Sequence, residues 1–198
     1  MVQVELTLNL INMKITQLIF LRHAHTQKDP LVNVAKWGLS EDGKQQAKKV
    51  SEMPIMNFVD VICVSEERKT FLTVELLAKK LNKKPQPFPF FNEVKRGDKF
   101  LTKEEFELEK VKQLTNLSYA AFDGETGTEA LARFKTGIDF VVRENKNKTI
   151  LIVTHGTILN IYFANLLNAY NELPDRWDRT IFCTVGVVEN GKVIQDIC

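Results

Sequence analysis

The sequence is poor in the residues that build covalent or metal cross-links. Its 198 residues include three cysteines, at positions 63, 183 and 198, and three histidines, at positions 23, 25 and 155. The cysteines are odd in number and form no CxxC pair, so we expect neither a disulfide framework nor a zinc site. A reducing cytoplasm is the compartment that fits this usage best. A metal site formed by the H-x-H pair His23 and His25 with His155 is disfavoured because acids at suitable spacing are missing.

Long apolar runs and an excess of one charge are also missing. The apolar runs stop after a handful of residues, far short of the roughly 20 needed to span a bilayer. The 27 Lys and Arg residues nearly balance the 25 Asp and Glu residues, so we expect no basic surface for nucleic acid or membrane. Neither GxGxxG nor GxxxxGK[ST] occurs, which gives no support for a glycine-rich nucleotide loop. Any anion must be bound by a local cluster.

The composition itself is that of an ordinary globular protein, with 44% hydrophobic and 26% charged residues. Such a chain can bury roughly 70% of the surface that its unfolded form exposes. No shift in composition marks a linker, so we expect one domain over residues 1–198. The first twelve residues, MVQVELTLNLIN, read either as a short strand or as an extension upstream of a start at Met13. They lack the basic region of a signal peptide.

Strand and helix patterns alternate along the chain. Short apolar runs predict strands at residues 15–21, 58–64 and 149–154, and a final hairpin over 182–188 and 193–197. Helices are predicted over 40–53, 69–81, 102–114, 126–144 and 157–167, with Ser40 as an N-cap and Thr102 with Glu105 as a capping box. The pattern predicts an α/β fold: a three-layer α/β/α sandwich with a mainly parallel sheet. Residues from about 88 to 123 are expected to form a small cap.

Candidate catalytic residues directly follow the predicted strands. Arg22 and His23 follow the first strand, and His155 follows the strand at 149–154. Ligands of open α/β sheets bind outside the carboxyl ends of strands. A lone histidine is most simply a structural residue, but two at equivalent strand ends favour a shared site.

These residue types suit attack on a phosphoryl group. A neutral imidazole can act as the nucleophile. A phosphomonoester carries about two negative charges, so cations or N–H donors must surround it, and an acid must protonate the departing oxygen. Arg22 offers a forked donor, the segment from Ser65 to Lys69 offers further cations, and Glu93 is the acid that a lid loop could supply.

Six segments resemble, in the same order, the motifs of the histidine phosphatase superfamily in its phosphoglycerate-mutase-like branch. They are LRHAHT at 21–26, LSEDGKQQA at 39–47, SEERKTFLTVE at 65–75, NEVKRG at 92–97, GET at 124–126 followed by Arg133, and IVTHG at 152–156. Each segment alone is weak evidence for the resemblance. Their shared order along nearly the whole chain is specific to the family.

This resemblance implies a role for each matching residue. His23 is the phosphorylated nucleophile, and Glu93 is the general acid and then the general base. His155 and a group of side chains hold the phosphate: Arg22, Lys69, Arg68 and Thr26. No metal and no organic cofactor is implied. The expected partner is a small phosphorylated substrate or a phosphoprotein, with no nucleic acid and no membrane.

Three departures from the family pattern leave alternatives open. Lys69 stands where the family has a second phosphate-binding arginine, and lysine lacks the planar fork. Asp29 stands where many members have asparagine, and Ala24 replaces a glycine. The segment from His23 to Leu39 is shorter than expected for a mutase. A phosphatase, a phosphoglycerate mutase and a catalytically weak phospholigand-binding module therefore all stay as hypotheses.

Several residues have competing interpretations. His25 is expected at the rim of the site. Phe88, Phe90 and Phe91 either line a substrate pocket or pack a cap against the core, the simpler reading. Residues 103–112, KEEFELEKVK, are read as a solvated helix face with Phe106 inward. Trp37 and Trp177 have no assigned role.

Overall fold

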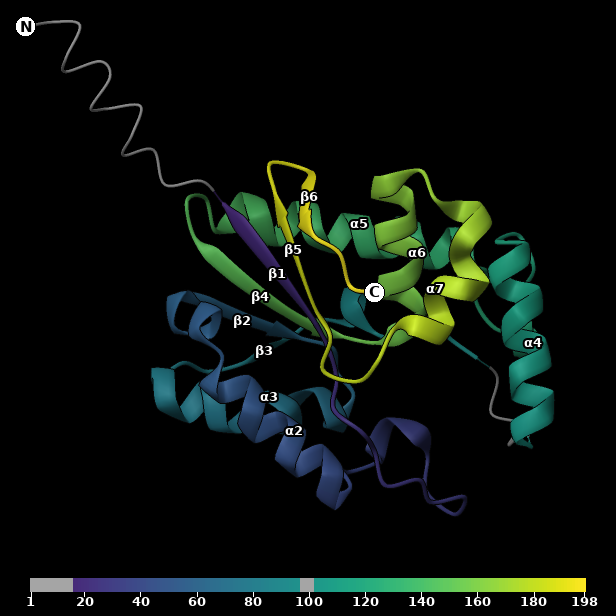
Figure 1. Ribbon diagram of the computed structural model, residues 1–198, viewed down its shortest axis with the longest axis horizontal. Helices are drawn as coiled ribbons and strands as arrows, with labels where there is room; N and C mark the ends of the chain where they lie inside the picture. Colours follow the sequence, from purple (N-terminus) through teal and green to yellow (C-terminus); the bar gives the residue numbers. More distant parts are fainter. Residues whose placement is uncertain (1–15, 97–101) are drawn as a thin grey trace, which may run out of the picture.

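A six-stranded mixed sheet forms the centre of the computed structural model, which describes residues 16–96 and 102–198 (Figure 1). The strand order is β3-β2-β4-β1-β5-β6. Strands β3, β2, β4 and β1 are parallel, β5 is antiparallel to β1, and β6 is antiparallel to β5. The strands are β1 (Gln17–Arg22), β2 (Val61–Val64), β3 (Gln86–Pro87), β4 (Thr149–Thr154), β5 (Val185–Glu189) and β6 (Lys192–Gln195). The two interpretations of residues 1–12, and Gly97 of the NEVKRG motif, lie outside the described residues.

Helices cover both faces of this sheet, as a three-layer sandwich requires (Figure 1). α2 (Glu41–Glu52) and α3 (Arg68–Leu81) cover one face, and α5 (Gly127–Glu144) and α6 (Gly156–Leu167) cover the other. Strand β1 shows the reason, because its side chains alternate between two apolar clusters. Leu18 and Phe20 pack toward α5 and α6, whereas Ile19 and Leu21 pack toward α2 and α3. The predicted α/β fold is confirmed.

The strand register aligns the ends at which the candidate residues lie. Arg22 at the end of β1 pairs with Thr154 at the end of β4, and Val64 at the end of β2 pairs with Val153. Three parallel strands therefore finish side by side, and the residues that follow them meet at one edge of the sheet.

Local capping signals set the starts of three helices. Ser40 accepts from the backbone N–H of Gly43, and capping boxes begin α4 (Lys103–Thr115) at Thr102 and α5 at Thr126. The observed bounds lie within one or two residues of the expected helices. A side chain that satisfies an otherwise unpaired N–H fixes the start of a helix without help from distant residues.

Two predicted strands begin three residues later than expected. The strand predicted from residue 58 starts at Val61, because Pro54–Phe58 form a short 3₁₀ helix and Phe58 is exposed. The strand predicted from residue 182 starts at Val185, since Cys183 has a positive φ of 59° that extended backbone cannot contain. The hairpin turn is as expected, with positive φ at Asn190 and Gly191.

Several short elements were not predicted. They are the edge strand β3, helix α7 (Leu173–Arg179) and the 3₁₀ helices Val34–Lys36, Pro89–Phe91, Ala121–Asp123 and Tyr170–Glu172. Helix α7 is short and mostly polar, but a proline in its first turn is a start signal that sequence reading could have used.

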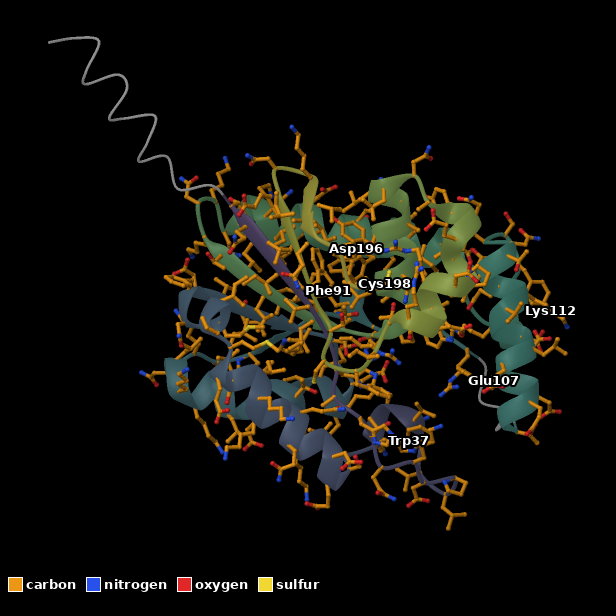
Figure 2. All side chains as sticks on the ribbon, in the orientation of Figure 1. Trp37, Phe91, Glu107, Lys112, Asp196 and Cys198 are labelled. Carbon is orange, nitrogen blue, oxygen red and sulfur yellow. The ribbon has the colours of Figure 1, made fainter. Side chains whose placement is uncertain are left out.

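Helix α4 lies beyond α7 at one end of the molecule, away from the sheet (Figure 1). Its residue Lys112 projects from the outer side of the helix (Figure 2), whereas Phe91 lies fully buried in the interior. Phe88 and Phe90 pack against the same apolar cluster as Phe91, as the packing interpretation predicted. In the described part of the chain, no helix is long and apolar enough to cross a membrane.

Candidate active site

His23 and His155 face each other at the shared edge of β1 and β4. Their ring centroids lie 5.1 Å apart at an interplanar angle of 62°, and both side chains are buried. The backbone N–H of His23 donates to the Thr154 carbonyl at 2.9 Å, and the N–H of Ala24 donates to the Thr73 hydroxyl at 2.9 Å. The loop after β1 is thus tied both to β4 and to α3. Ala24 does not have a positive φ, so its replacement of a glycine causes no backbone strain.

The hydrogen bonds of His23 determine its tautomer. Its Nδ1 lies 2.8 Å from the Ala24 carbonyl oxygen. Because a carbonyl can only accept, Nδ1 carries the proton and Nε2 keeps its lone pair. The pKa of His23 lies well below its usual range, mainly because the ring is buried and also because His155 and Lys69 are near. The hydrogen bond to Ala24 raises the pKa but does not outweigh these effects. The ring is therefore neutral at physiological pH, with a free lone pair on Nε2.

Arg22 lies beside this ring, held between the chain segments that follow α6. Its guanidinium donates to the Thr180 carbonyl and lies over Phe182, with Cζ 4.3 Å from the ring centroid. Its Nε is buried and has no hydrogen-bond partner among the described residues. A buried donor without an acceptor is costly, so this N–H is suited to an anionic oxygen.

Gly156 makes the position of Arg22 possible. A Cβ added at Gly156 would lie 3.0 Å from Arg22 Cζ and 2.9 Å from the Trp177 ring. Only glycine lets the start of α6 come this close to the guanidinium. The close packing of Arg22 and Trp177 therefore explains why the IVTHG motif has a glycine at this position.

Lys69 lies in the cluster but is bound to a carboxylate of its own segment. Its Nζ is 2.5 Å from Glu67 Oε2 and donates to the Val34 carbonyl at 3.3 Å. The lysine side chain is 5% exposed and that of Glu67 is 14% exposed. The pair is therefore shielded from solvent. Separating the two partners would leave a buried charge uncompensated, which is destabilising.

The same carboxylate reaches His155. Glu67 Oε1 lies 3.3 Å from His155 Nε2, and the Ser65 hydroxyl lies 2.8 Å from the same nitrogen. Burial lowers the pKa of His155, while Glu67 and Glu93 raise it and Lys69 lowers it. Burial raises the pKa of Glu67, but His155 and Lys69 outweigh it and the net shift is downward. Glu67 is thus an ionised carboxylate between two phosphate-binding candidates.

Glu93 is brought to the site by the first turn of α6. Its Oε2 accepts from the N–H of Thr157 at 3.0 Å, and its Oε1 accepts from the N–H groups of Ile158 at 3.1 Å and Val94 at 2.9 Å. Burial alone would raise the pKa of Glu93, yet His155, Lys110 and these N–H donors lower it to about 2. The carboxyl group is therefore ionised at physiological pH.

A second ion pair holds the loop that carries Glu93. Arg133 on α5 pairs with Glu125 at 2.7 Å and donates to the carbonyls of Asn92 and Glu93. Arg133 and the GET segment thus hold the backbone that carries Glu93 in place. They do not lie in the histidine cluster.

The structure does not bring all of the predicted residues together. Arg68 is exposed at the start of α3, and Lys69 is the cation of that segment that enters the cluster. Thr26 is buried, and its backbone forms a bridge with Leu39. Asp29 is exposed and accepts from the N–H of Leu31, so its carboxylate closes its own turn. His25 is half-buried, with its Nδ1 2.8 Å from the Ser40 hydroxyl.

The prediction of a fully solvated face over residues 103–112 is wrong for Lys110. This side chain is buried, and its Nζ donates to the Thr157 hydroxyl at 3.0 Å and to the Gln113 side-chain oxygen at 3.2 Å. Lys110 follows the inward-facing Phe106 by four residues, the spacing of one helix face, and this signal could have found it. Sequence reasoning also missed Trp177 and Glu67, which contact Arg22 and Lys69 respectively.

The charges of the cluster suit an anion held beside a neutral imidazole. Arg22 and Lys69 supply positive charge near the two histidines, Lys110 supplies it near Glu93, and the carboxylates of Glu67 and Glu93 oppose it. In residues 16–96 and 102–198, no group of three or more His, Cys, Asp or Glu is placed to hold a metal ion.

Comparison with solved structures finds the same fold in phosphatases. A mycobacterial glucosyl-3-phosphoglycerate phosphatase is 16% identical to this chain. The alignment covers 92% of this chain and 99% of the phosphatase, with a TM-score of 0.74. A mutant phosphoserine phosphatase from Entamoeba histolytica, in complex with phosphoserine, is 21% identical over 91% and 94% of the two chains, with a TM-score of 0.72. A putative alpha-ribazole-5'-P phosphatase from Escherichia coli is 18% identical over 92% and 96%, with a TM-score of 0.70.

Curated protein sequences give no match to this chain. A family model described as histidine phosphatase superfamily (branch 1) matches residues 18–197. The match runs from β1 to the end of the last strand pair and includes every strand-end residue of the cluster. The chain therefore belongs to branch 1 of the histidine phosphatase superfamily.

Proposed function

We propose that the protein is a phosphatase that hydrolyses a phosphomonoester through a phosphohistidine on His23. The observation that carries this proposal is the buried, neutral His23 ring, whose Nδ1–H is bound to a carbonyl so that Nε2 is the nucleophile. The unpartnered Nε of Arg22 supplies a donor for a phosphoryl oxygen beside it. Solved phosphatases with this fold are consistent with the same chemistry.

The site has two ends in this reaction. The phosphate end consists of Arg22, His23, Lys69 and His155, and the leaving-group end consists of Glu93 and the side chains around Lys110. Nε2 of His23 attacks phosphorus, the bond to the ester oxygen breaks, and that oxygen takes a proton from the carboxyl group of Glu93. Glu93 then accepts a proton from the water that attacks phosphorus, and the nitrogen–phosphorus bond breaks.

Glu93 needs a proton before it can act as the acid. In the structure its pKa is about 2, so it is ionised before substrate binds. A phosphoryl group brings negative charge next to this carboxylate, and like charge raises the pKa of a carboxyl group. Substrate binding thus promotes the proton uptake that the first step uses. The ionised form suits the second step directly.

Hydrolysis of p-nitrophenyl phosphate in the presence of EDTA tests the proposal. The wild-type protein should release product, and His23→Ala should abolish turnover, since the nucleophile is lost. His25→Ala is the matched control and should keep most of the activity, because His25 bonds to Ser40 outside the cluster. Unchanged turnover in His23→Ala would refute the proposal, and activity that EDTA removes would show a metal requirement.

A second candidate, a weakly catalytic phospholigand-binding module, is favoured by the ion pair between Lys69 and Glu67. This pair withdraws from the phosphate the cation that stands in place of the family's arginine. Lys69→Arg separates the two candidates. A large rise in turnover supports an impaired site, whereas little change supports a competent lysine. Interconversion of 2- and 3-phosphoglycerate would instead identify a mutase.

A further inference from the structure

A groove lies between α3 and the segment that leads from it to the edge strand β3. It encloses about 550 Å³, within the range of roughly 300–1,000 Å³ that ligand pockets span. Its apolar lining comes from Phe71, Leu72 and Ala78 of α3 and from Pro85 of the following segment. None of the side chains that line it belongs to the candidate active site, and α3 and β3 lie at the opposite side of the molecule from α4 and α7 (Figure 1).

The turn at the end of α3 builds the second wall of this groove. Asn82 has a positive φ of 51°, and the N–H of Lys83 donates to the Ala78 carbonyl at 2.9 Å. This is the Schellman arrangement that ends many helices. The chain therefore turns back beside α3, and the pairing of Gln86 with Cys63 of β2 fixes the far end of the segment. Both walls are held by backbone hydrogen bonds, so the groove is formed before a ligand binds.

Lysines form the rim of the groove. Lys79, Lys83 and Lys84 line it, together with one carboxylate, that of Glu75. Glu75 pairs with Lys79 at 2.7 Å, so it offsets the charge of that lysine. Within residues 16–96 and 102–198, neither Lys83 nor Lys84 forms an ion pair with a carboxylate. Two positive charges therefore remain beside the apolar lining.

Stabilisation of the helix end does not account for all of these lysines. Cations in the last turn of a helix interact favourably with its dipole, and Lys79 and Lys80 occupy that turn. Lys80 also donates to the Ser51 carbonyl at 2.9 Å. Lys83 and Lys84 follow the end of the helix, where the effect of the dipole has fallen off. Their charges are thus available to a ligand.

The shape and charge of the groove favour a peptide over other anionic partners. A membrane takes up apolar side chains that protrude from a protein, whereas this apolar lining is recessed. A nucleic acid binds through many phosphate contacts to a large set of cations, and two lysines are too few. A peptide can place an apolar side chain in the groove and carboxylates beside Lys83 and Lys84, which gives complementary charge.

We propose that this groove docks an acidic segment of a protein partner. An apolar side chain of that segment packs against Phe71, Leu72 and Pro85, and its carboxylates pair with Lys83 and Lys84. The docking goes beyond the proposed phosphatase function, because no residue of the groove takes part in the proposed reaction.

Selection of random peptides displayed on phage tests the inference, with inorganic phosphate present to occupy the active site. The wild-type protein should enrich sequences in which apolar residues stand beside aspartate and glutamate. The strongest binder, made as a fluorescein-labelled peptide, is then titrated by fluorescence anisotropy. Lys83→Glu with Lys84→Glu should weaken its binding by about tenfold or more, because like charges then face each other. Leu72→Gln should weaken it severalfold through the loss of apolar contact.

The matched control is Lys135→Glu with Lys146→Glu, since both lysines are exposed and lie in or just after α5, on the opposite face of the sheet. This variant has the same net charge as the groove variant and should bind the peptide as the wild type does. Circular dichroism and the Tm of each variant check its folding. The His23→Ala protein should also keep wild-type binding, which separates the docking from the proposed reaction.

Four outcomes overturn the inference and leave the phosphatase proposal intact. They are the enrichment of no peptide, the enrichment of peptides without acidic residues, binding that survives Lys83→Glu with Lys84→Glu, and an equal loss of binding in the control. Vesicles that contain phosphatidylserine, or a single-stranded oligonucleotide, could instead bind through the same lysines more tightly than the peptide. That result would assign the groove to a membrane or to nucleic acid and would also overturn the inference.

Discussion

The two ends of the candidate site are built in different ways. At the phosphate end, Arg22, His23 and His155 directly follow paired strands, and the register of β1 and β4 alone places the histidines together. At the leaving-group end, Glu93 and Lys110 come from a loop and from α4, and the first turn of α6 holds both. The phosphate end is part of the sheet, whereas the leaving-group end depends on how α4 packs against α7 and α6.

The two ends also differ in how their charges are balanced. The cation Lys69 has an internal carboxylate, Glu67, at 2.5 Å, so the phosphate end is partly neutralised before any ligand binds. At the leaving-group end, the carboxylate of Glu93 is held by backbone N–H groups. A phosphoryl group must therefore compete with Glu67, while a proton must reach an already stabilised Glu93.

The largest effect is expected from removing the acid and base. Glu93→Gln should reduce the turnover of an alkyl phosphate by roughly 100- to 10,000-fold, the range for general acid–base catalysis. With p-nitrophenyl phosphate, whose leaving group needs little protonation, the phosphoenzyme should still form but break down slowly. Rapid-mixing kinetics should then show a burst of p-nitrophenol followed by a slow steady rate.

The control for this prediction is Glu52→Gln, an exposed position at the end of α2, which should leave both phases as in the wild type. A Glu93→Gln protein with wild-type rates on alkyl phosphates would show that another group is the acid. In that case the leaving-group end would have to be reassigned.

Much of the fold could be predicted because its signals are local. The apolar runs that become β1 and β4, and the caps at Ser40, Thr102 and Thr126, lie within a few residues of the structure that they specify. Where the prediction was wrong, tertiary context or backbone conformation prevailed. Cys183 looked like part of a strand, but its positive φ delays the start of β5.

The phosphate end was predictable in position but not in its charge balance. His23 and His155 stand out because they follow apolar strands. Glu67 stands in a run of charged residues, SEERK, of which only the cations Arg68 and Lys69 were predicted to face the phosphate. Its contact with His155 joins residues far apart in the chain, which no local pattern reports.

Lys110 was missed although its spacing from Phe106 places the two side chains on one helix face. The helix over 103–115 is rich in charged residues, so its buried side is not marked by an apolar stripe. The burial of Lys110 depends on Thr157 and Trp177. The contact between α4 and the first turn of α6 is thus the part of the site that sequence reading describes least well.

A smaller effect, of opposite sign, is expected from removing the internal carboxylate at the phosphate end. Glu67→Gln leaves Lys69 buried without its 2.5 Å partner, and an unpaired buried charge is destabilising. A phosphate ion can then take the place of the carboxylate. Inorganic phosphate should therefore inhibit this variant about tenfold more strongly than the wild type, a gain worth about 1.4 kcal/mol, and should raise its Tm further.

Glu75→Gln serves as the matched control, because Glu75 pairs with Lys79 at 2.7 Å on the exposed side of α3. It should change neither the inhibition constant nor the response of Tm to phosphate. Weaker phosphate binding in Glu67→Gln would contradict the competition account. It would show that Glu67 orients Lys69 and His155 for the substrate.

A third effect concerns stability at low pH and again distinguishes the two ends. Folding lowers the pKa of Glu93 from its ordinary 4.5 to about 2, with burial opposing the shift and His155, Lys110 and backbone N–H groups causing it. The unfolded chain therefore binds the proton more readily, so this stabilisation is complete above pH 4.5 and is lost as the pH falls toward 2. It amounts to at most about 3 kcal/mol.

Denaturant unfolding of the wild type and of Glu93→Gln should measure this contribution. The wild type should be the more stable protein at neutral pH, and the difference should shrink as the pH falls from 4.5 to 2. The Glu52→Gln protein should not show this loss. If the wild type and Glu93→Gln differ by the same amount at both pH extremes, the N–H donors of α6 do not stabilise the ionised carboxylate. The pKa of Glu93 in the folded protein would then lie near its ordinary 4.5, and its proton uptake would need less help from the charge of the substrate.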